Sequence, residues 1–270
     1  MIVPVATEAS DANSDQFVAR PTRTGTWNLL RGGTATASAY AVCRPDRRWF
    51  VSVDAWDEQD HDPLINAMIA DLNQNLHTRI DGTDETSLER LTKHGFVPDR
   101  RELEFLLSPD PQRTGLAATP IPDELTLLPA DEVDETALRQ LDDRLREEVP
   151  GADGWINDPA EFHEYTYDEK HFDPASYLVA VDDDREQFAG LVRVWANGPR
   201  SRLGLIGVTR AYRRRGVARA LLAAAFKPLH ERGVSEVLAE VDASNTASLK
   251  LMESIAAVET GASLVLRRSI

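Results

Sequence analysis

The sequence has little of several features that would define a function class by themselves. It has one cysteine, Cys43, so no disulfide can form within the chain, and we expect a reducing compartment. No apolar run approaches the roughly 18 residues that cross a bilayer. Residues 1–15 lack a basic region followed by a long apolar core, so we expect no secretion signal, no membrane partner and a cytoplasmic location. The histidines show no metal-ligand spacing, and we expect no metal site.

Acidic residues are absent from one long segment of an otherwise acidic chain. The 270 residues include 45 Asp and Glu against 30 Lys and Arg, which gives a net charge of −15. Residues 187–230 nevertheless contain no acid and nine bases, where the composition would give about seven acids. A segment kept free of negative charge favours a polyanionic ligand, whereas the acidic remainder makes nucleic acid a poor partner.

Within this segment, residues 206–218 change from an apolar strand to an arginine-rich turn and then to an alanine-rich helix. The strand ends near Val208, and we expect the helix to begin near Val217. A strand that passes into a helix through such a turn leaves free backbone N–H groups, which can bind a pyrophosphate. Gly216 would let the backbone approach the phosphates, and the run Arg213-Arg214-Arg215 would add fork-shaped donors.

The spacing Arg213-x-x-Gly216-x-Ala218 resembles the pyrophosphate loop of the GCN5-related N-acetyltransferase (GNAT) superfamily. A second signature comes after the next expected strand, where Asn245-x-x-Ser248 resembles the start of the helix that flanks pantetheine in this family. Asn245 would also serve as an ordinary helix N-cap. The two signatures occur in the family's order, and the resemblance implies acetyl-CoA, or another acyl-CoA, as the cofactor.

The resemblance also implies a set of site residues. The backbone of Val208, at the end of a splayed strand, would polarise the acyl carbonyl. We predict Glu240 as the general base and Ser248 as a further catalytic group, while Glu147, Glu148 and Asp153 fall in the region of the family's acceptor wall. Each of these acids could equally be a solvated surface residue. The residues predicted to bind the cofactor are Ile206, Val208, Arg213, Arg214, Arg215, Gly216, Val217, Ala218, Asn245 and Ser248.

The sequence departs from the family at the position that supplies a proton. Many members have a tyrosine there that protonates the departing thiolate, whereas this chain has Met252, whose thioether cannot donate a proton. Because a thiol has a pKa of about 8.5, the CoA thiolate is a tolerable leaving group near neutral pH. Solvent, the Ser248 hydroxyl or Tyr212 could serve as the donor. The family's Gly-Phe after this helix is also replaced, by Ala256-Ala257.

A proline-rich segment, 109–123, indicates a linker between two domains. The C-terminal domain, 124–270, shows strand and helix patterns in the order β-α-α-β-β-β-α-β-α-β, which is that of the acetyltransferase fold. The predicted fold class is α/β (α+β): a tandem GNAT fold in two domains, with a mixed, mostly antiparallel central sheet flanked by helices.

The N-terminal domain, 1–108, looks like a copy of the C-terminal one. An offset of 161 residues aligns 80–91 with 241–252 without a gap, with identities at Asp81, Ser87 and Leu88. The turn that would hold phosphate in this copy, 54–62, has five acids and no glycine, and should repel a pyrophosphate. We therefore predict a degenerate GNAT-like domain at 1–108 and a complete, catalytic acyl-CoA-binding domain at 124–270. An unrelated α/β module is the alternative for the first half.

The acceptor can be inferred only from charge. Residues 124–186 carry a net charge of −15 and residues 187–270 carry +7, so an acidic lobe would face a basic cofactor lobe and attract a small cationic amine. Acids that serve only solubility are the alternative. We predict an acetyl-CoA-dependent N-acetyltransferase that works by direct attack in a ternary complex. An acyl-CoA-binding module with little turnover and an O-acyltransferase remain alternatives. The acceptor, the acyl-chain length and the formation of a homodimer stay open.

Overall fold

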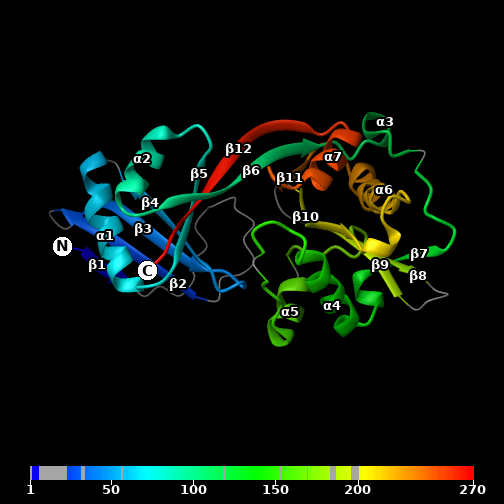
Figure 1. Cartoon of the computed structure of the whole chain (residues 1–270), viewed down its shortest axis with the longest axis horizontal. Coiled ribbons are helices and arrows are strands. Elements are labelled where there is room, and N and C mark those ends of the chain that lie inside the picture. The colour runs from blue at the N-terminus through cyan, green and yellow to red at the C-terminus, as the bar shows by residue number, and fades with distance from the viewer. Residues whose placement is uncertain are drawn as a thin grey trace. The chain divides into compact units, whose positions relative to one another are not determined.

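A computed structural model of the chain describes residues 2–5, 23–31, 34–55, 57–117, 119–152, 154–168, 170–182, 187–195 and 201–270 (Figure 1). The chain divides into two compact units. Unit 1 combines Met1–Arg101 with Ala262–Ile270, and unit 2 is Glu102–Gly261. Within the ranges just given, no helix has both the length and the apolar character needed to cross a bilayer.

Unit 1 contains a sheet with the strand order β1-β2-β3-β4-β5-β12. The strands β1 to β4 form an antiparallel meander, β4 and β5 pair in parallel, and β12 pairs antiparallel with β5. A core that includes Trp27, Leu64, Met68 and Phe96 fills the unit. Its elements are β1 (Ile2–Val5), β2 (Arg23–Arg31), β3 (Thr34–Cys43), β4 (Trp49–Ala55), the short turn η1 (Glu58–Asp60), α1 (His61–Leu72), β5 (Leu76–Asp81), α2 (Glu85–Lys93), the start of β6 (Val97–Leu107) and the end of β12 (Val258–Arg268).

Unit 2 contains a sheet with the strand order β6-β11-β10-β9-β8-β7, in which the one parallel pair among the described strands is β10 with β11. Its elements after β6 are α3 (Pro111–Thr114), β7 (Leu125–Pro129), η2 (Ala130–Glu132), α4 (Glu135–Arg146), α5 (Pro159–Thr166), β8 (Tyr177–Asp182), β9 (Gln187–Trp195), β10 (Ser201–Val208), η3 (Arg210–Tyr212), α6 (Val217–Glu231), β11 (Val237–Asp242) and α7 (Thr246–Ser254).

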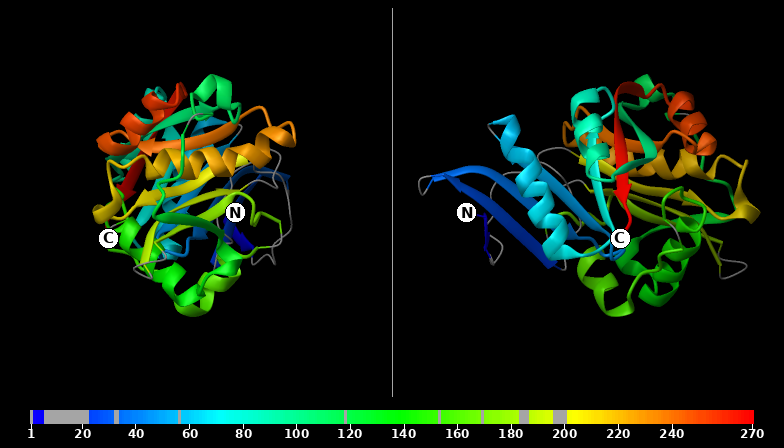
Figure 2. Two further views of the ribbon diagram at one scale, coloured as in Figure 1. Left: turned by 90° about the vertical axis from the view of Figure 1, so that its right-hand side faces the viewer. Right: turned by 60° about the vertical axis from the view of Figure 1, so that its left-hand side comes forward.

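Helices cover both faces of the unit 2 sheet (Figure 2). Alternate residues of a strand point to opposite faces, so β9 places Val192 in the core beneath α6 and α7 and Leu191 in the core beneath α4 and α5. Phe226 of α6 and Leu141 of α4 are buried in these two cores. The predicted fold class, a mixed and mostly antiparallel sheet flanked by helices, is confirmed.

Most helices of unit 2 begin at a side chain that caps their free backbone N–H groups. Asp134 accepts from Ala137 N at 2.8 Å before α4, Asp158 accepts from Ala160 N at 2.9 Å before α5, and Asn245 accepts from Ser248 N at 3.1 Å before α7. The helix α6 differs, because its N-cap is Gly216, which has no side chain. Its first N–H groups are therefore left for another partner.

The compact units do not coincide with the predicted domain bounds. The proline-rich segment 109–123 lies within unit 2, where it forms α3, and the carbonyl of Gly115 at the end of α3 accepts from Arg219 at 2.9 Å. At the other end of the chain, Ala262–Ile270 belongs to unit 1. The helix α3 of this segment packs against α6.

The 161-residue offset found in the sequence recurs in the structure. The segment β5-α2-β6 and the segment β11-α7-β12 have identical element bounds once 161 is added. The helix caps correspond as well: Asp84 accepts from Ser87 N, as Asn245 accepts from Ser248 N. Both helices also end in the same way, because Gly95 and Ala256 both have a positive φ. The match extends from strand register to cap geometry, which supports the predicted duplication.

Each unit completes its sheet with a strand from elsewhere in the chain. Residues 263–268 of β12 pair with β5 in unit 1, from Ser263↔Asp81 to Arg268↔Leu76. Residues 102–107 of β6 pair with β11 in unit 2, from Glu102↔Asp242 to Leu107↔Val237. The 161-residue offset relates these two registers: each residue pair of β6 and β11 corresponds to a residue pair of β12 and β5. The two halves of the chain have thus exchanged their last strands, and a cut at the predicted linker would leave both sheets incomplete.

Candidate functional site

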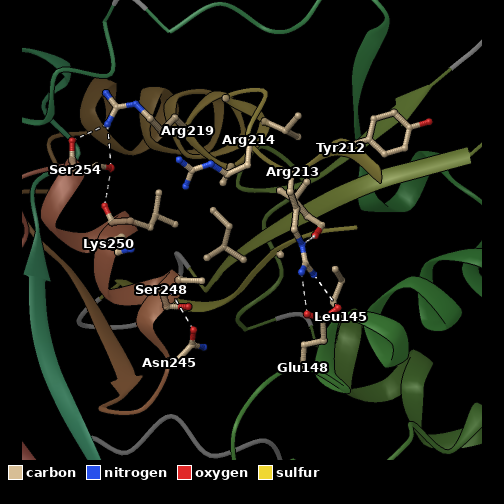
Figure 3. A pocket seen from close by; sticks show the side chains of 18 of the residues that line it. Leu145, Glu148, Tyr212, Arg213, Arg214, Arg219, Asn245, Ser248, Lys250 and Ser254 are labelled. Carbon is tan, nitrogen blue, oxygen red and sulfur yellow. Dashed lines mark hydrogen bonds and ion pairs between the residues drawn. The ribbon is translucent and has the colours of Figure 1, made fainter. Parts of the chain in front are cut away.

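A cavity of unit 2 lies where two parallel strands diverge. β10 and β11 pair only at Ser201↔Val237 and Arg202↔Leu238. Beyond these pairs, the rest of β10 bonds to β9 and the rest of β11 bonds to β6. A cleft of about 510 Å³ opens in this gap (Figure 3), and it is lined by Leu145, Glu148, Val149, Ile206, Gly207, Val208, Tyr212, Arg213, Arg214, Gly216, Val217, Ala218, Arg219, Asn245, Ala247, Ser248, Lys250, Leu251 and Ser254.

The cleft gathers the residues that the sequence predicted for cofactor binding. They come from the end of β10, the turn after it, the start of α6 and the first turn of α7. Arg215 is the exception and does not line the cleft. The predicted base Glu240 is also absent from the lining, and its carboxylate pairs with Arg202. Of the predicted acceptor-wall acids, Glu148 lines the cleft, Glu147 is exposed outside it, and Asp153 lies outside the described residues.

Free backbone donors line the cleft at the start of α6. The N–H groups of residues 214–219 donate no hydrogen bond to any described residue. Arg214 and Gly216 have φ values of 65° and 83°, in the left-handed region. Left-handed residues in such a turn make successive N–H groups converge on one point, and the helix dipole adds positive potential there. This geometry fits a phosphate or pyrophosphate group.

The end of β10 presents another free donor. Thr209 N donates to Ala189 O on β9 at 2.8 Å, and N–H groups alternate along a strand. The N–H of Val208 therefore points away from β9, toward the side on which β10 and β11 have parted. The carbonyl of Val208 is already bonded, since it accepts from Arg213 Nε at 2.8 Å. The strand end can thus donate one hydrogen bond to a ligand carbonyl in the cleft.

Arg213 connects this strand end to the segment after α4. Its two terminal nitrogens donate to the two carboxylate oxygens of Glu148, at 2.8 and 2.9 Å. The hydrogen bond from Arg213 lowers the pKa of Glu148 below its ordinary value, and Glu148 in turn raises the pKa of Arg213. A carboxylate held in this way is a poor proton acceptor near neutral pH. The predicted pyrophosphate ligand Arg213 is therefore used by the protein itself.

The segment that carries Glu148 is anchored to α4 by a buried acid. Burial opposes ionisation of Asp142, but Arg146 and Arg193 lower its pKa below the ordinary value. Asn157 donates from Nδ2 to Asp142 at 2.9 Å and to Asp143 at 2.7 Å, which ties residue 157 back to the helix. The end of α4 beside the cleft is thus held by two arginines, Arg146 and Arg193, and by the side chain of Asn157.

The arginine at the far side of the turn is also paired. Arg215 bonds to Glu124 at 3.1 Å and lies over the ring of Tyr212, with 5.5 Å from its Cζ to the ring centroid. The Tyr212 hydroxyl donates to the buried carboxylate of Asp182 at 2.6 Å, and in Figure 3 it points away from the cleft. Tyr212 is therefore not placed to protonate a leaving thiolate, although its ring forms part of the wall.

Two residues of α7, Met252 and Ser248, were considered in the sequence analysis in relation to protonation of the departing thiolate. Met252 is buried in the core and does not line the cleft, so this position supplies nothing to the site. Ser248 lines the cleft, and its hydroxyl makes no hydrogen bond with the described residues. Of the proton donors considered from the sequence, the Ser248 hydroxyl and solvent remain.

Several lining residues were not predicted. Leu145, Arg219, Lys250, Leu251 and Ser254 all face the cleft. The helical period could have found part of this set: Ser248, Leu251 and Ser254 recur at intervals of three residues from Asn245 along α7. Leu145 could not be found in this way, because it comes from a helix more than 60 residues earlier in the chain.

The matching region of unit 1 is nearly filled. β4 and β5 also part after two parallel pairs, but the cavity between them is only about 130 Å³. The hydroxyl of Thr78 on β5 donates to the carbonyl of Val51 on β4 at 2.8 Å, inside this gap. The residue at the equivalent position of unit 2 is Ala239, which has no hydroxyl. A side chain of unit 1 thus satisfies a strand carbonyl inside this gap, which Ala239 cannot do in unit 2.

The acidic turn of unit 1 is engaged by the protein itself. Asp57 accepts from Gln59 N at 3.2 Å, and Glu58 pairs with Arg90 of α2 at 2.7 Å. Asp60 is buried, where it pairs with Arg31 and accepts from the Thr36 hydroxyl at 2.9 Å. In unit 1, the turn before α1 therefore contains carboxylates. The corresponding turn of unit 2, before α6, presents free backbone N–H groups instead. The prediction that unit 1 repels a pyrophosphate gains support from this arrangement.

Comparison with known proteins shows which family a part of the chain resembles. Residues 138–256, which include every residue that lines the cleft, match the family described as "Acetyltransferase (GNAT) family". These residues therefore resemble a GNAT domain, in a match that spans less than half of the chain. The predicted resemblance is confirmed.

A curated relative and two solved structures add detail. A mycothiol acetyltransferase from Clavibacter sepedonicus is 37% identical over 101 residues, a match that covers 37% of this chain and only 33% of the relative. A GCN5-related N-acetyltransferase from Sphaerobacter thermophilus has a TM-score of 0.68 at 20% identity, over 91% of this chain and 80% of that one. A tandem GNAT protein from the clavulanic acid biosynthesis pathway has a TM-score of 0.67 at 16% identity, over 93% and 84%. At these identities, the two structures are similar to this chain in fold alone.

Proposed function

We propose that the protein is an acetyl-CoA-dependent N-acetyltransferase whose cofactor site is the cleft of unit 2. The observation that carries this proposal is that one cavity contains free backbone N–H groups at two places, the start of α6 and the end of β10. The N–H groups of residues 214–219 suit the pyrophosphate, and the N–H of Val208 suits the acyl carbonyl. The open edges of β10 and β11 between them offer backbone groups to the two amides of pantetheine.

Acetyl-CoA would supply an activated acetyl group on a thioester. The N–H of Val208 would stabilise the negative charge that develops on the carbonyl oxygen as the amine nitrogen bonds to carbon. Arg213 and Glu148 would keep this donor in place, because Arg213 holds the carbonyl of the same residue. As the C–S bond breaks, the Ser248 hydroxyl or solvent would donate to the thiolate.

The acceptor is proposed to be a small cationic amine in the cytoplasm. The support is the strong negative charge of residues 124–186, which include α4, α5 and the segment between them. Glu240 is not part of the proposal, because it pairs with Arg202 and does not line the cleft. The amine would lose its proton to solvent or to an acid of its own binding site.

We also propose that the chain is a tandem GNAT protein in which unit 1 is a degenerate copy. The matched element bounds and caps support the duplication. The Thr78 bond and the Glu58 pair with Arg90 support the loss of the cofactor site. The proposal predicts one cofactor per chain rather than two.

Titration calorimetry of the full chain with acetyl-CoA tests both proposals. We expect one site, abolished in Gly216→Glu, because a carboxylate there would face the phosphates. The matched control is Gly233→Glu at the other end of α6: its φ is 79° against 83°, and both positions have open space around them. The control should bind like wild type. Two sites would overturn the degenerate copy, and no binding would overturn the acetyltransferase proposal.

Thiol release with a panel of amines then separates enzyme from binding module. Stoichiometric acetyl-CoA binding without CoA release for any amine would favour the acyl-CoA-binding module. The absence of a tyrosine at Met252 is the observation behind that second candidate. Release with alcohols but not with amines would favour an O-acyltransferase.

A further inference from the structure

The cleft of unit 2 is electrically uneven along its length. On one side it is lined by Leu145, Val149 and the end of β10, together with the carboxylate of Glu148. On the other side it is lined by Arg214, Arg219 and Lys250 (Figure 3). A ligand that fills this cleft therefore has a neutral end and a strongly anionic end.

The cations around the cleft differ in whether the protein already uses them. Arg213 is paired with Glu148 and Val208, and Arg215 is paired with Glu124. Arg219 donates to the carbonyls of Ser254 and Gly115 at 2.6 and 2.9 Å. Arg214 and Lys250, by contrast, make no hydrogen bond or ion pair with any described residue. These two cations are available to a ligand.

Arg214 is also held in an unfavourable backbone conformation. Its φ of 65° lies in the left-handed region, which costs a non-glycine residue on the order of 1 kcal/mol or more. A glycine would remove this cost and would still leave the turn its shape. The turn thus keeps a strained arginine whose side chain has no partner within the protein, which is typical of a residue that serves a ligand.

The free backbone N–H groups at the start of α6 and the side chains of Arg214 and Lys250 are two separate groups of donors. The N–H groups of residues 214–219 converge at the start of α6 and suit one pyrophosphate. Lys250 belongs to α7, four residues before its end, and is exposed at the border of the cleft. A second anionic group, outside the pyrophosphate, would lie between α7 and the turn.

Acyl-CoA carries one such group, the phosphate on the 3′-oxygen of its ribose. We propose that Arg214 and Lys250 bind this 3′-phosphate, so that the cleft selects free CoA thioesters over thioesters that lack it. Those that lack it are 3′-dephospho-CoA esters and acyl groups on the phosphopantetheine arm of carrier proteins. This inference rests on the proposed cofactor site and adds the feature by which that site tells its cofactor from close analogues.

Titration calorimetry with acetyl-CoA and with acetyl-3′-dephospho-CoA measures this selection. Each charge-assisted contact to phosphate is expected to be worth about tenfold in affinity. Wild type should bind acetyl-CoA about 100-fold more tightly than the dephospho compound. Lys250→Met and Arg214→Gln should each reduce this ratio to about tenfold, and the double variant should bring it close to one. In each of these variants, affinity for acetyl-CoA should fall far more than affinity for the dephospho compound.

Lys227→Met is the matched control, because Lys227 is an exposed lysine on α6 that does not line the cleft. It should keep the wild-type ratio, and thermal unfolding should show that each variant is folded. A wild type that binds both compounds equally would overturn the assignment of the 3′-phosphate while leaving the cofactor site intact. An unchanged ratio in the double variant would overturn it as well. A wild type that binds neither compound would overturn the proposed function together with this inference.

Discussion

The contact between Gly207 of β10 and Leu145 of α4 couples the strand end to the acceptor side of the cleft. A methyl group at residue 207 would lie 2.9 Å from both terminal carbons of Leu145, well inside van der Waals contact. Leu145 is buried, so it cannot swing into solvent, and Gly207→Ala must displace it. Overpacking of this kind costs about 1–3 kcal/mol. We expect Gly207→Ala to destabilise unit 2 by that amount and to lower acetyl-CoA affinity, since Val208 adjoins the displaced strand.

A double-mutant cycle tests this cause. Leu145→Ala alone should cost about 2–5 kcal/mol, because it leaves a cavity. In that background the added methyl group of Gly207→Ala has room, so its own cost should fall to near zero. Urea unfolding of the four proteins would then show a favourable coupling of about 1–3 kcal/mol.

Gly190→Ala provides the contrast. Its methyl group would lie 2.5 Å from the carbonyl oxygen of Gly207, which is backbone rather than a side-chain end. Leu145→Ala cannot relieve that clash, so the cost of Gly190→Ala should be the same in both backgrounds. Equal costs of Gly207→Ala with and without Leu145 would refute the proposed steric coupling.

The remaining predictions concern the ion pair, the proton donor and the exchanged strand. Glu148→Gln should remove a pH-dependent contribution: because the folded pKa of Glu148 is lowered, its stabilisation is present above about pH 5 and lost as the pH falls through the folded value. Unfolding of both proteins between about pH 3 and 7 should therefore converge at the acid end, and a constant difference would contradict this. Ser248→Ala should lower kcat less than about tenfold with KM unchanged, since a thiolate of pKa about 8.5 can leave without help; a loss of 100-fold or more would make Ser248 the general acid. Truncation after Gly261 should unfold unit 1, because it removes the buried residues Val265 and Leu266 together with the strand that pairs with β5. Fast hydrogen exchange in β5 is the expected result, and native protection there would contradict it.

The parts of the site that could be predicted from the sequence are those that depend on residues close to one another along the chain. The strand, turn and helix at 201–231 and the Asn245 cap follow from local patterns of charge, glycine and apolar spacing. The proposed duplication is also visible in the sequence, because residues 80–91 and 241–252 align without a gap. Local rules of this kind act within a few residues, so a single sequence can display them.

The roles of individual arginines could not be predicted in the same way. Arg213, Arg214 and Arg215 look equivalent in sequence, yet two of them pair with acids 65 and 91 residues away. Such a pairing depends on where α4 and the segment before β7 pack against the turn. Likewise, Tyr212 looks like a candidate acid until the buried carboxylate of Asp182 comes beside it. Charge in the sequence shows which groups are present, but tertiary packing decides which of them remain available.

The bounds of the compact units differ from the predicted linker for a related reason. Four prolines at 109–123 indicate a stiff segment, but they do not indicate whether the segment packs against a domain. Arg219 of α6 donates a hydrogen bond to the carbonyl of Gly115 in this segment, and Leu116 of the same segment is buried in the core of unit 2. Strand exchange is likewise invisible in a sequence, because β6 and β12 have the same alternating pattern whichever β-strand they pair with.

The exchange of β6 and β12 has a consequence for the order in which the protein can be made. Translation proceeds from the N-terminus, so residues 1–101 leave the ribosome long before the strand that completes their sheet. Residues 262–270 are synthesised after the whole of unit 2, and β5 keeps an unpaired edge until they arrive. Unit 2, by contrast, has its β6 segment from the outset. The half proposed to bind the cofactor can therefore fold first, and the half that precedes it in the gene must be finished last.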